Sequence, residues 1–380
     1  MKVSLTDICD FQGGTQPPKD EWIDQPARGY VRMLQIRDFT QSDKNYIEYV
    51  KDTGKLKICI EDDILIGRYG ASIGKILTGL AGAYNVAIVK TIPDEKVVSK
   101  KYLYWYLNSQ YFQRFISNVG SRAAQAGFNK NDLGAAQIPL VDKERQEEIC
   151  EVLEKANKLI SFRKQQLAKL DELIKARFVE IFGDPVSNPL HWKKVKLSEL
   201  ADIKIGPFGS LLHKEDYVTG GHPLVNPSHI ISGKIIVDND LTLTEGKYFE
   251  LSAYHLKKND VILGRRGEMG RCAVVNEEGL LCGTGSLLIR TNGTVTADYI
   301  QKIISFPTFK KTIEDMAVGQ TMPNLNVPIV SNFMIIVPPL SVQKDYYDFV
   351  ECVDQQKQTV QQSFEKLELM KKALMQEYFG

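Results

Sequence analysis

KLDELIKARFVEIFG occupies residues 169–183 and has a counterpart, KLELMKKALMQEYFG, at residues 366–380. The spacing of 197 positions recurs along the chain in the pairs Asp63 with Asp260, Tyr102 with Tyr299, Phe112 with Phe309, Gln146 with Gln343 and Gly183 with Gly380. Self-similarity at a fixed period indicates the architecture more strongly than any single motif. This period is far too long for a solenoid, so each copy must be a domain with an appendage. We expect a pseudo-twofold chain that can engage a two-part target.

The first part of each copy has the sequence pattern of a small globular domain. Ile64–Ile66 and Val86–Val89 are strand-like runs between glycine-rich turns, and Tyr102–Ser117 has apolar residues at helical spacing. The second copy repeats this order. At 380 residues the chain is long enough for each repeat to bury its own core. We predict mixed α and β structure in each globular part, whereas the order of the strands is not readable.

The second part of each copy has the pattern of one long helix. Residues 143–182 contain neither Gly nor Pro, and their apolar residues recur at intervals of mostly three or four. Such a helix would be about 60 Å long, which exceeds the diameter of a small domain. The predicted helix–helix residues are Leu153, Leu167, Leu170 and Ile174 in the first copy and Val353, Val360, Phe364, Leu367 and Leu374 in the second.

Two such apolar stripes can bury each other, and antiparallel pairing would place the globular parts at opposite ends. The alternative is that each helix lies along its own globular core. The predicted fold class is α/β mixed (α+β), with two pseudo-repeated globular domains separated by an antiparallel two-helix coiled coil. The predicted boundaries are 1–142 for the first globular domain, 143–183 for the first long helix, 184–194 for a linker, 195–339 for the second globular domain and 340–380 for the second long helix.

Composition is that of a soluble globular protein, with 43% hydrophobic and 25% charged residues. The net charge of +1 neither supports nor excludes nucleic-acid binding. The six cysteines form no CxxC pair, which favours reduced thiols in a cytosolic protein. The N-terminal sequence MKVSLTDICD has no apolar signal region, and no run of 18 apolar residues occurs. We expect a cytoplasmic protein that does not enter a membrane.

The motifs of common enzyme classes fail in this chain. GASIGK at residues 70–75 resembles part of a phosphate loop, but Tyr69 stands where the first glycine should be and Ile76 follows the lysine. Asn226 opens the string nearest to a methyltransferase NPP-aromatic motif, which lacks the second proline and the aromatic residue. All five histidines lie in the second copy, so they cannot serve a chemistry that both copies need. We predict no catalytic residues and no metal site.

A short basic loop follows the apolar strand in both copies. The loops are GRYG, with Arg68 and Tyr69, and GRRG, with Arg265 and Arg266. Glycine allows a backbone to approach a phosphate closely, and arginine offers planar paired donors to phosphates or guanine edges. The further candidates Lys75 and Arg271 follow at related places. A solvated arginine on a surface hairpin is the plainer alternative, and recurrence in both copies favours the DNA interpretation.

A polar stretch precedes the closing strand of each copy, at residues 120–133 and 319–330. Its candidates for reading base edges are Arg122, Gln125, Asn129 and Lys130 in the first copy and Gln320, Thr321 and Asn324 in the second. TQPPKDEW and FGSLLHKEDY add Lys19 and Lys214. A shared framework with divergent polar loops is what two readers of different sequences require, although drift of surface loops would give the same pattern.

Taken together, these features resemble the specificity subunit of a type I restriction–modification system, over essentially the whole chain. The resemblance rests on the openings VSLTDICD and VKLSELAD, the stretches DDILIGRYG and NDVILGRRG, and the closings IPLVDKERQ and IIVPPLSVQ, each leading into a long helix. The first closing lacks the double proline, and Gly67 and Gly264 stand where the family often has a small polar residue.

The resemblance implies a protein without catalysis of its own. Each globular part would be a target-recognition domain that reads one half of an interrupted double-stranded DNA target, and the helices would set the gap. Two methyltransferase subunits would dock on the helices, with restriction/translocase subunits joining in the full complex. S-adenosylmethionine, ATP and Mg²⁺ would belong to these partners. The alternatives are an enzyme fused to recognition modules and a coiled-coil interaction scaffold without DNA readout.

Overall fold

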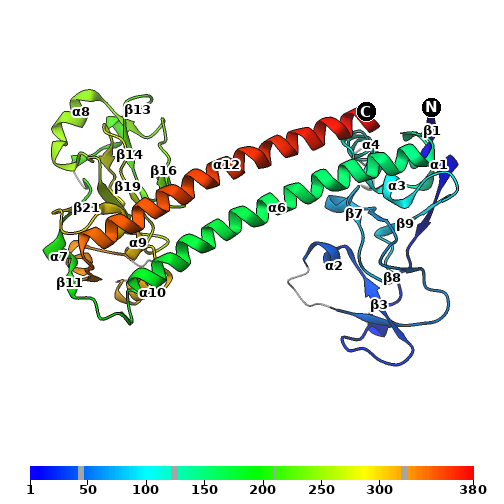
Figure 1. Cartoon of the computed structure of the whole chain (residues 1–380), viewed down its shortest axis with the longest axis horizontal. Coiled ribbons are helices and arrows are strands. Elements are labelled where there is room, and N and C mark those ends of the chain that lie inside the picture. The colour runs from blue at the N-terminus through cyan, green and yellow to red at the C-terminus, as the bar shows by residue number, and fades with distance from the viewer. Residues whose placement is uncertain (42–46, 121–126, 209–210, 318–323) are drawn as a thin grey trace. The chain divides into compact units, whose positions relative to one another are not determined.

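The computed structural model describes residues 1–41, 47–120, 127–208, 211–317 and 324–380. These residues form two compact units, of which unit 1 contains Met1–Leu167 with Thr359–Gly380 and unit 2 contains Ala168–Gln358 (Figure 1). The two long helices are α6 (Lys143–Phe182) and α12 (Leu340–Phe379), and one part of each helix lies in unit 1 and the other part in unit 2. Each unit is therefore a globular part built from one repeat, together with half of both helices.

Unit 1 contains two four-stranded sheets and a short strand pair. The first sheet is antiparallel, in the order β2 (Cys9–Gly13), β9 (Ile88–Pro93), β6 (Leu65–Gly67), β7 (Ile76–Leu77). The second has the order β4 (Tyr49–Lys51), β3 (Tyr30–Leu34), β8 (Gly82–Tyr84), β5 (Ile58–Cys59), with β3 and β8 parallel. The pair is β1 (Lys2–Ser4) with β10 (Gln137–Pro139). The helices are α1 (Leu5–Ile8), α2 (Ile36–Thr40), α3 (Lys100–Leu107), α4 (Gln110–Gly120) and α5 (Lys130–Leu133).

Unit 2 repeats this plan. Its first sheet has the order β12 (Ala201–Ile205), β21 (Ser286–Thr291), β18 (Asp260–Gly264), β19 (Cys272–Val274), and its second has β13 (Tyr217–Val218), β17 (Thr242–Leu243), β14 (His222–Val225), β20 (Leu281–Cys282). The strand pairs are β11 (Lys194–Lys196) with β22 (Met334–Ile336) and β15 (Ile230–Ile231) with β16 (Lys234–Ile235). The helices are α7 (Leu197–Leu200), α8 (Glu245–Glu250), α9 (Ala297–Ile304), α10 (Pro307–Met316) and α11 (Val327–Ser331).

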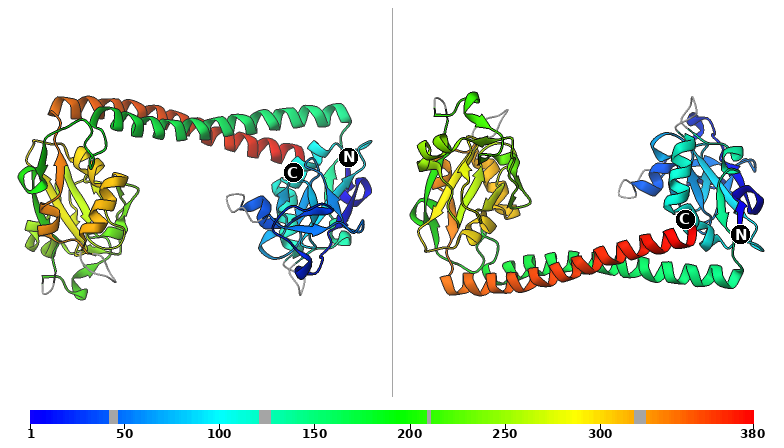
Figure 2. Two further views of the ribbon diagram at one scale, coloured as in Figure 1. Left: turned by 90° about the horizontal axis from the view of Figure 1, so that it is seen from below. Right: turned by 90° about the horizontal axis from the view of Figure 1, so that it is seen from above.

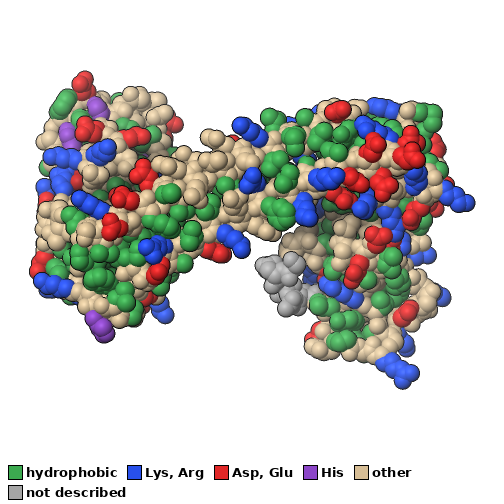
Figure 3. Space-filling model, in the orientation of Figure 1, with side chains coloured by type: hydrophobic (Ala, Val, Ile, Leu, Met, Phe, Trp, Pro, Cys, Tyr) green, Lys and Arg blue, Asp and Glu red, His purple; other side chains and the backbone are tan. Residues whose placement is uncertain are grey.

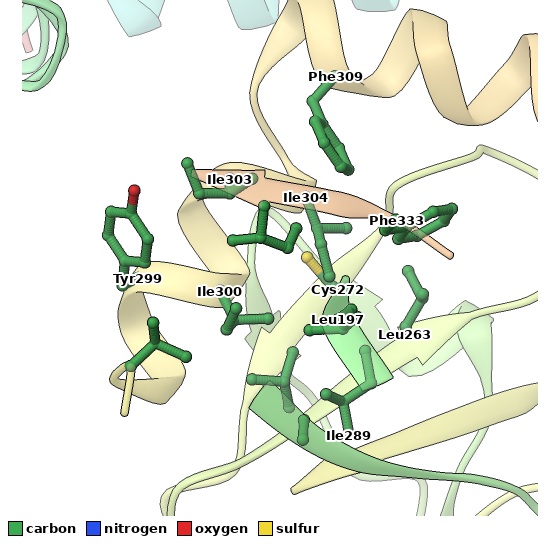
Figure 4. Packing of buried hydrophobic residues seen from close by; sticks show 14 of the residues in the cluster. Leu197, Leu263, Cys272, Ile289, Tyr299, Ile300, Ile303, Ile304, Phe309 and Phe333 are labelled. Carbon is green, nitrogen blue, oxygen red and sulfur yellow. The ribbon is translucent and has the colours of Figure 1, made fainter. Parts of the chain in front are cut away.

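Strand alternation explains how the first sheet of unit 2 is buried on both faces. Val261 and Leu263 of β18 belong to the larger core, whereas Ile262 between them packs in a second cluster with Val225. Successive side chains of a strand point to opposite faces, so an unbroken apolar run suits a doubly covered strand. Figure 4 shows Leu263 and Ile289 of the sheet in one cluster with Ile300 and Ile304 of α9. Full burial of each such side chain contributes about 1.5–3 kcal/mol.

The start of each long helix is attached to the globular part of its own repeat by a buried glutamine. Gln146 accepts a hydrogen bond from Ser99 N at 2.9 Å and donates to the carbonyls of Val97 and Val141. Its side chain is fully buried. Ile149 and Leu153, in the next turns of α6, also belong to the core of unit 1. The alternative in which a helix lies on its own globular core is therefore correct for these first turns.

Each long helix ends in the globular core of the other repeat: α6 ends in unit 2 and α12 ends in unit 1. Phe379 of α12 is fully buried in unit 1, where its ring lies 5.2 Å from that of Tyr102. Phe182 of α6 is fully buried in unit 2, with its ring 5.2 Å from that of Tyr299. Each unit therefore requires a helix end supplied by the other half of the chain.

Within each unit α6 and α12 lie side by side and run antiparallel, as predicted (Figure 2). In unit 1 Lys371 Nζ donates to Asn157 Oδ1 at 2.7 Å, and Lys164 lies over the Phe364 ring. Residue numbers thus increase along α6 in the direction in which they decrease along α12. Of the predicted stripe, Leu153, Val353 and Val360 are buried, and Leu167, Leu170, Ile174, Phe364, Leu367 and Leu374 are half-buried.

Three further features of the described residues bear on function. None of their helices is both long and apolar enough to cross a membrane. Within the same residues, no three His, Cys, Asp or Glu side chains are grouped so that they could hold a metal ion. Five of the six cysteines are buried, and burial raises the pKa of Cys9, Cys272 and Cys282 to about 12. These thiols are protonated at neutral pH and are poor nucleophiles.

Candidate nucleic-acid interface

The basic loop and the polar stretch of each repeat lie next to each other, although about 60 residues separate them. Arg68 Nε donates to the carbonyl of Phe128 at 2.9 Å. At the equivalent place in unit 2, Arg265 Nε donates to the carbonyl of Leu325 at 3.3 Å and to Asn324 Oδ1 at 3.1 Å. One nitrogen of each arginine therefore has a structural role, and we name this pair of contacts the arginine struts.

A backbone bridge reinforces each strut. Tyr69 pairs with Gly127, and Arg266 pairs with Asn324, in short antiparallel bridges outside the named strands. A Cβ atom on Gly127 would lie 2.7 Å from the Tyr69 ring, so a glycine is needed for the ring to rest on this backbone. The bridges align the two segments, and the side chains on either side of them differ between the units.

The side chains beside the struts differ in charge and in exposure. Tyr69 is 39% exposed in unit 1, whereas Arg266 is an exposed cation at the same place in unit 2. Burial, and secondarily the charge of Arg266, holds the pKa of Arg265 below its ordinary value. Arg265 nevertheless remains cationic, because arginine side chains are not deprotonated in proteins at neutral pH. Unit 2 thus presents two adjacent guanidinium groups where unit 1 presents one beside a phenol.

Three of the predicted base readers already have partners within the protein. The Asn129 side chain accepts from Asp132 N at 3.1 Å, and the Asp132 side chain accepts from Asn129 N, which together cap α5. Lys130 forms an ion pair with Asp10 of β2. Asn324 likewise accepts from Arg265. The contacts of Asn129 and Lys130 are exposed, so this lysine and this amide edge stay accessible to a ligand.

The other predicted cations lie at separate places. Lys75 is exposed where the basic loop of unit 1 ends, and Lys214 is exposed in a short helical turn of unit 2. Arg271 donates to Glu268 at 3.1 Å and to the carbonyl of Pro227. Lys19 pairs with Glu48 and lies over the Trp22 ring. The remaining predicted residues, Arg122, Gln125, Gln320 and Thr321, lie outside the described residues.

Sequence reasoning missed two polar clusters. In unit 1, Glu48 of the loop before β4 accepts from Gln35 Nε2 at 2.7 Å and from Arg37, as well as from Lys19. In unit 2, Lys310 of α10 donates to Glu268 of the basic loop at 2.9 Å. These residues come from different elements, up to 42 positions apart, so no local pattern could have found them. On the face shown in Figure 3, basic and acidic side chains are interspersed on both units.

The arrangement is suited to binding rather than to reaction. Arginine and lysine donors lie beside amide edges and glycine backbone, which are groups that contact phosphates and base edges. The same framework occurs in both units with different side chains around it. The molecule thus has the features of a protein with two separate recognition surfaces for nucleic acid.

Comparison with known proteins agrees with this class. The family model described as "Type I restriction modification DNA specificity domain" matches residues 1–172 and again residues 189–369. The specificity subunit of the type I restriction enzyme MjaVIII from Methanocaldococcus jannaschii is 22% identical, covering 98% of this chain and 90% of its own length. The specificity subunit of MjaIX from the same organism is also 22% identical, with coverage of 91% and 82%.

Two solved structures share the fold. One, described as the structural basis of complex assembly and conformational transition of the type I R-M system, has a TM-score of 0.68 at 15% identity, covering 100% of this chain and 97% of that chain. The S subunit of a type I restriction–modification system from M. genitalium has a TM-score of 0.55 at 15% identity, with coverage of 100% and 96%.

The chain belongs to the family of type I restriction–modification DNA specificity domains and contains two of them. Its role is DNA sequence specificity, and specificity subunits of this kind are not themselves catalytic. The predicted fold class, family and non-catalytic role are thereby confirmed.

Proposed function

We propose that the chain reads a two-part DNA target, with residues 1–142 and 195–339 as its two target-recognition domains. Each domain reads one half of an interrupted sequence in double-stranded DNA. The observation that carries this proposal is the pair of arginine struts. Arg68 and Arg265 hold equivalent loop pairs in the two units, while the neighbouring residues Tyr69 and Arg266 differ. A constant support with variable exposed groups is the arrangement that two readers of unlike half-sites need.

The long helices set the distance between the half-sites in this proposal. Each has 40 residues, which corresponds to about 60 Å. Half-sites on one face of B-DNA lie about 34–36 Å apart per helical turn, which is within the span that such helices can set. Phe182 and Phe379 are each packed into a globular core, which supports a role of helix length in setting the gap.

The helices also serve as the docking surface for two methyltransferase subunits. In unit 1, the apolar side chains of Val152, Leu159 and Phe162 are 39%, 47% and 52% exposed on α6. Their spacing of seven and three residues places them on one face of the helix. A contiguous exposed apolar face on a helix is suited to a partner helix. S-adenosylmethionine and adenine-N6 chemistry belong to those partners, and ATP and Mg²⁺ belong to the restriction/translocase subunits.

Methylation mapping tests the reading function. Methylated adenines would be mapped across the genome of the source strain, with the gene intact and with it deleted. We expect one interrupted two-part motif to lose methylation on deletion. If no motif changes, the chain does not direct methylation in that strain. Binding that weakens steeply with salt would then separate a DNA reader without partners from a scaffold, because only the former releases counterions.

Matched insertions test the spacing function. One heptad inserted after Leu167 and one after Phe364 lengthen both helices by about 10 Å, or about three base pairs at 3.4 Å each. We expect the methylated motif to keep both half-sites and to gain about three base pairs in the gap. The control places seven residues in the exposed turns at Gly54 and Gly293, where a longer turn should leave the gap unchanged. An unchanged gap after the helix insertions would contradict the proposal.

A further inference from the structure

Unit 2 contains a cavity of about 540 Å³ between three elements that are far apart in the sequence. One wall is the β15–β16 hairpin at Ile230–Gly233. The second wall is the basic loop between β18 and β19, which contributes Glu268 and Arg271. The third is formed by α9 and the start of α10, with Lys302 and Lys310. The cavity therefore opens beside the loop that carries Arg265 and Arg266.

The charged residues that line the cavity leave it positive. Arg271, Lys302 and Lys310 are cations, and Glu268 is the one carboxylate among the lining residues. Glu268 accepts from Arg271 at 3.1 Å and from Lys310 at 2.9 Å. These two contacts hold the pKa of Glu268 below its ordinary value. Two positive charges of the lining remain uncompensated within the cavity.

Lys302 has the least favourable position of the three cations. It makes no ion pair in the described part of the chain, and it is half-buried. Burial, followed by the charge of Lys175, lowers its pKa. The charges of Asp354 and Asp171 offset this only in part, and an anion bound in the cavity would relieve the remaining cost of the desolvated cation.

The arginine in this cavity is held in a fixed orientation. Arg271 Nη1 donates to the carbonyl of Pro227 at 3.1 Å, and Nη2 donates to Glu268. A guanidinium group that is already held by backbone loses little side-chain freedom when it binds a ligand. Gln301 and Ser305, which also line the cavity, add uncharged polar groups.

Unit 1 has one cation at the matching positions and no charge cluster. Lys75 matches Arg271, because its carbonyl accepts from Gly67 N as that of Arg271 accepts from Gly264 N, whereas Lys302 and Lys310 match Trp105 and Gln113. Gln113 donates to the carbonyl of Gly74 at 2.9 Å, so this uncharged pair joins the loop to α4 directly. In unit 1, β3 is followed by α2, whereas β14 of unit 2 is followed by a short helical turn and the hairpin.

We propose that this cavity binds a backbone phosphate of the DNA, held by Lys310, Arg271 and Lys302, and that Glu268 is the internal anion that the phosphate displaces. Phosphate oxygens accept charge-assisted hydrogen bonds from both arginine and lysine. A contact to phosphate positions a protein on DNA without reading sequence. The proposal rests on the proposed DNA-reading function and adds a fixed phosphate anchor to the half-site that unit 2 reads.

The test measures binding to a duplex with the motif found by methylation mapping, across a range of NaCl concentrations. The protein is the full chain co-purified with its methyltransferase subunits. Lys310→Gln restores the residue type that unit 1 has at Gln113, so the fold should be retained. The matched control is Lys311→Gln, which removes an equal charge from the neighbouring exposed position of α10. Glu268→Gln removes the competing anion.

For Lys310→Gln we expect weaker binding to all sequences alike, and a salt slope reduced by about one. Lys311→Gln should change neither. Glu268→Gln should strengthen binding by about two- to fivefold, because exposed ion pairs contribute about 0–1 kcal/mol. If Lys310→Gln has no larger effect than Lys311→Gln, the cavity does not hold a phosphate of the DNA. If wild-type protein does not prefer its motif, the DNA-reading function itself is wrong.

A neutral methylphosphonate group, introduced at one phosphate at a time, identifies the source of the anion. In wild-type protein, one position in the half-site of unit 2 should weaken binding, and Lys310→Gln should abolish the effect at that position alone. Competition by inorganic phosphate without any sensitive methylphosphonate position would show a free anion in the cavity, which would overturn the proposal.

Discussion

In unit 1 the Tyr102 hydroxyl donates to the carbonyl of Pro139 at 2.8 Å, and in unit 2 the Tyr299 hydroxyl donates to the carbonyl of Ile336 at 2.9 Å. The arginine struts and the buried glutamines at the helix starts recur in the same way. In every case at least one partner is a backbone group. Since any residue supplies a backbone carbonyl or N–H, these bonds survive when the side chain at the partner position changes.

The bonds between two side chains do not recur in this way. Asp63 pairs with Lys90 at 2.6 Å in unit 1, whereas the equivalent Asp260 pairs with Arg290 at 2.6 Å in unit 2. The two cations do not occupy equivalent positions, because Lys90 lies opposite Leu65 and the residue at the matching place, opposite Ile262, is Leu288. The comparison teaches that the repeats share a framework of side-chain-to-backbone bonds, whereas this ion pair between two side chains is formed from different positions in each repeat.

The strongest test of this comparison concerns the helix ends. Phe379→Ala and Phe182→Ala each remove a fully buried ring, which should lower the free energy of unfolding by about 3–5 kcal/mol. Phe379→Ala should reduce hydrogen-exchange protection first in unit 1, and Phe182→Ala first in unit 2. The control Phe162→Ala, at a side chain 52% exposed, should change stability by about 0.5 kcal/mol or less. Equal loss of protection in both units after either change would contradict the assignment.

The two buried glutamines should contribute unequally to the free energy of unfolding. Gln146 makes three hydrogen bonds and Gln343 makes two, to Thr296 N and the carbonyl of Pro338. Gln146→Leu and Gln343→Leu should each cost about 1–3 kcal/mol, because buried partners lose their bonds, and Gln146→Leu should cost more. Urea denaturation measures both, with the exposed Gln361→Leu as the control. A larger effect at Gln343 would show that bond number does not set the cost.

Each arginine strut should support the recognition of one half-site only. Arg68→Ala removes one hydrogen bond that supports its loop pair, and Arg265→Ala removes one that is shared between two acceptors. Each loss is worth about 1–1.5 kcal/mol, or about five- to tenfold in affinity. Duplexes with one half-site scrambled separate the two readers. Arg68→Ala should impair recognition of one half-site and Arg265→Ala that of the other, while Arg114→Ala, at an exposed position of α4, should impair neither. Loss of both half-sites in one variant would refute independent reading.

The smallest expected effect is the acid sensitivity of unit 1. Burial opposes ionisation of Asp63, but the hydrogen bond from Lys90 and that from Ile60 N outweigh it, so the pKa of Asp63 is lowered. The folded form therefore binds fewer protons than the unfolded form. The resulting stability is present above the unfolded pKa of about 3.9 and is lost as pH falls through the folded pKa. Denaturation midpoints at pH 7 and pH 3 should differ less for Asp63→Asn than for wild type, and an unchanged difference would contradict this.

Much of the fold could be predicted because it depends on repetition and periodicity. The two long helices, their antiparallel pairing and the mixed globular parts follow from patterns along the sequence. Periodicity does not say what covers an apolar face, so the exchange of helix ends through Phe182 and Phe379 was not foreseen. The second sheet in each unit was missed as well, because its strands are only two to five residues long.

The candidate site was less predictable because its partners are distant. Asn129 heads an N-x-x-D pattern, so its capping role was readable from the sequence. The ion pair of Lys130 with Asp10 joins residues 120 positions apart, and nothing local to either indicates it. Similarly, recurrence of the basic loop identified Arg68 and Arg265. The sequence could not show that one nitrogen of each guanidinium group is bonded within the protein, because the carbonyl that accepts the bond is distant along the chain.

The spacing of equivalent residues changes most in one part of the chain. Gly14 and Gly206, at each of which a Cβ atom would collide with backbone, are 192 positions apart, whereas Asp63 and Asp260 are 197 apart. The five-residue difference falls between these two points, where most strands of the second sheet lie, and beyond it the spacing of matched backbone bonds stays within one residue of 197. In evolutionary terms, each repeat has a segment that tolerates changes in its length, and this segment lies between two ends whose backbone packing does not tolerate change. Recombination within the flanking framework could replace the segment and change the target, while the helices and their packed ends would stay unaltered.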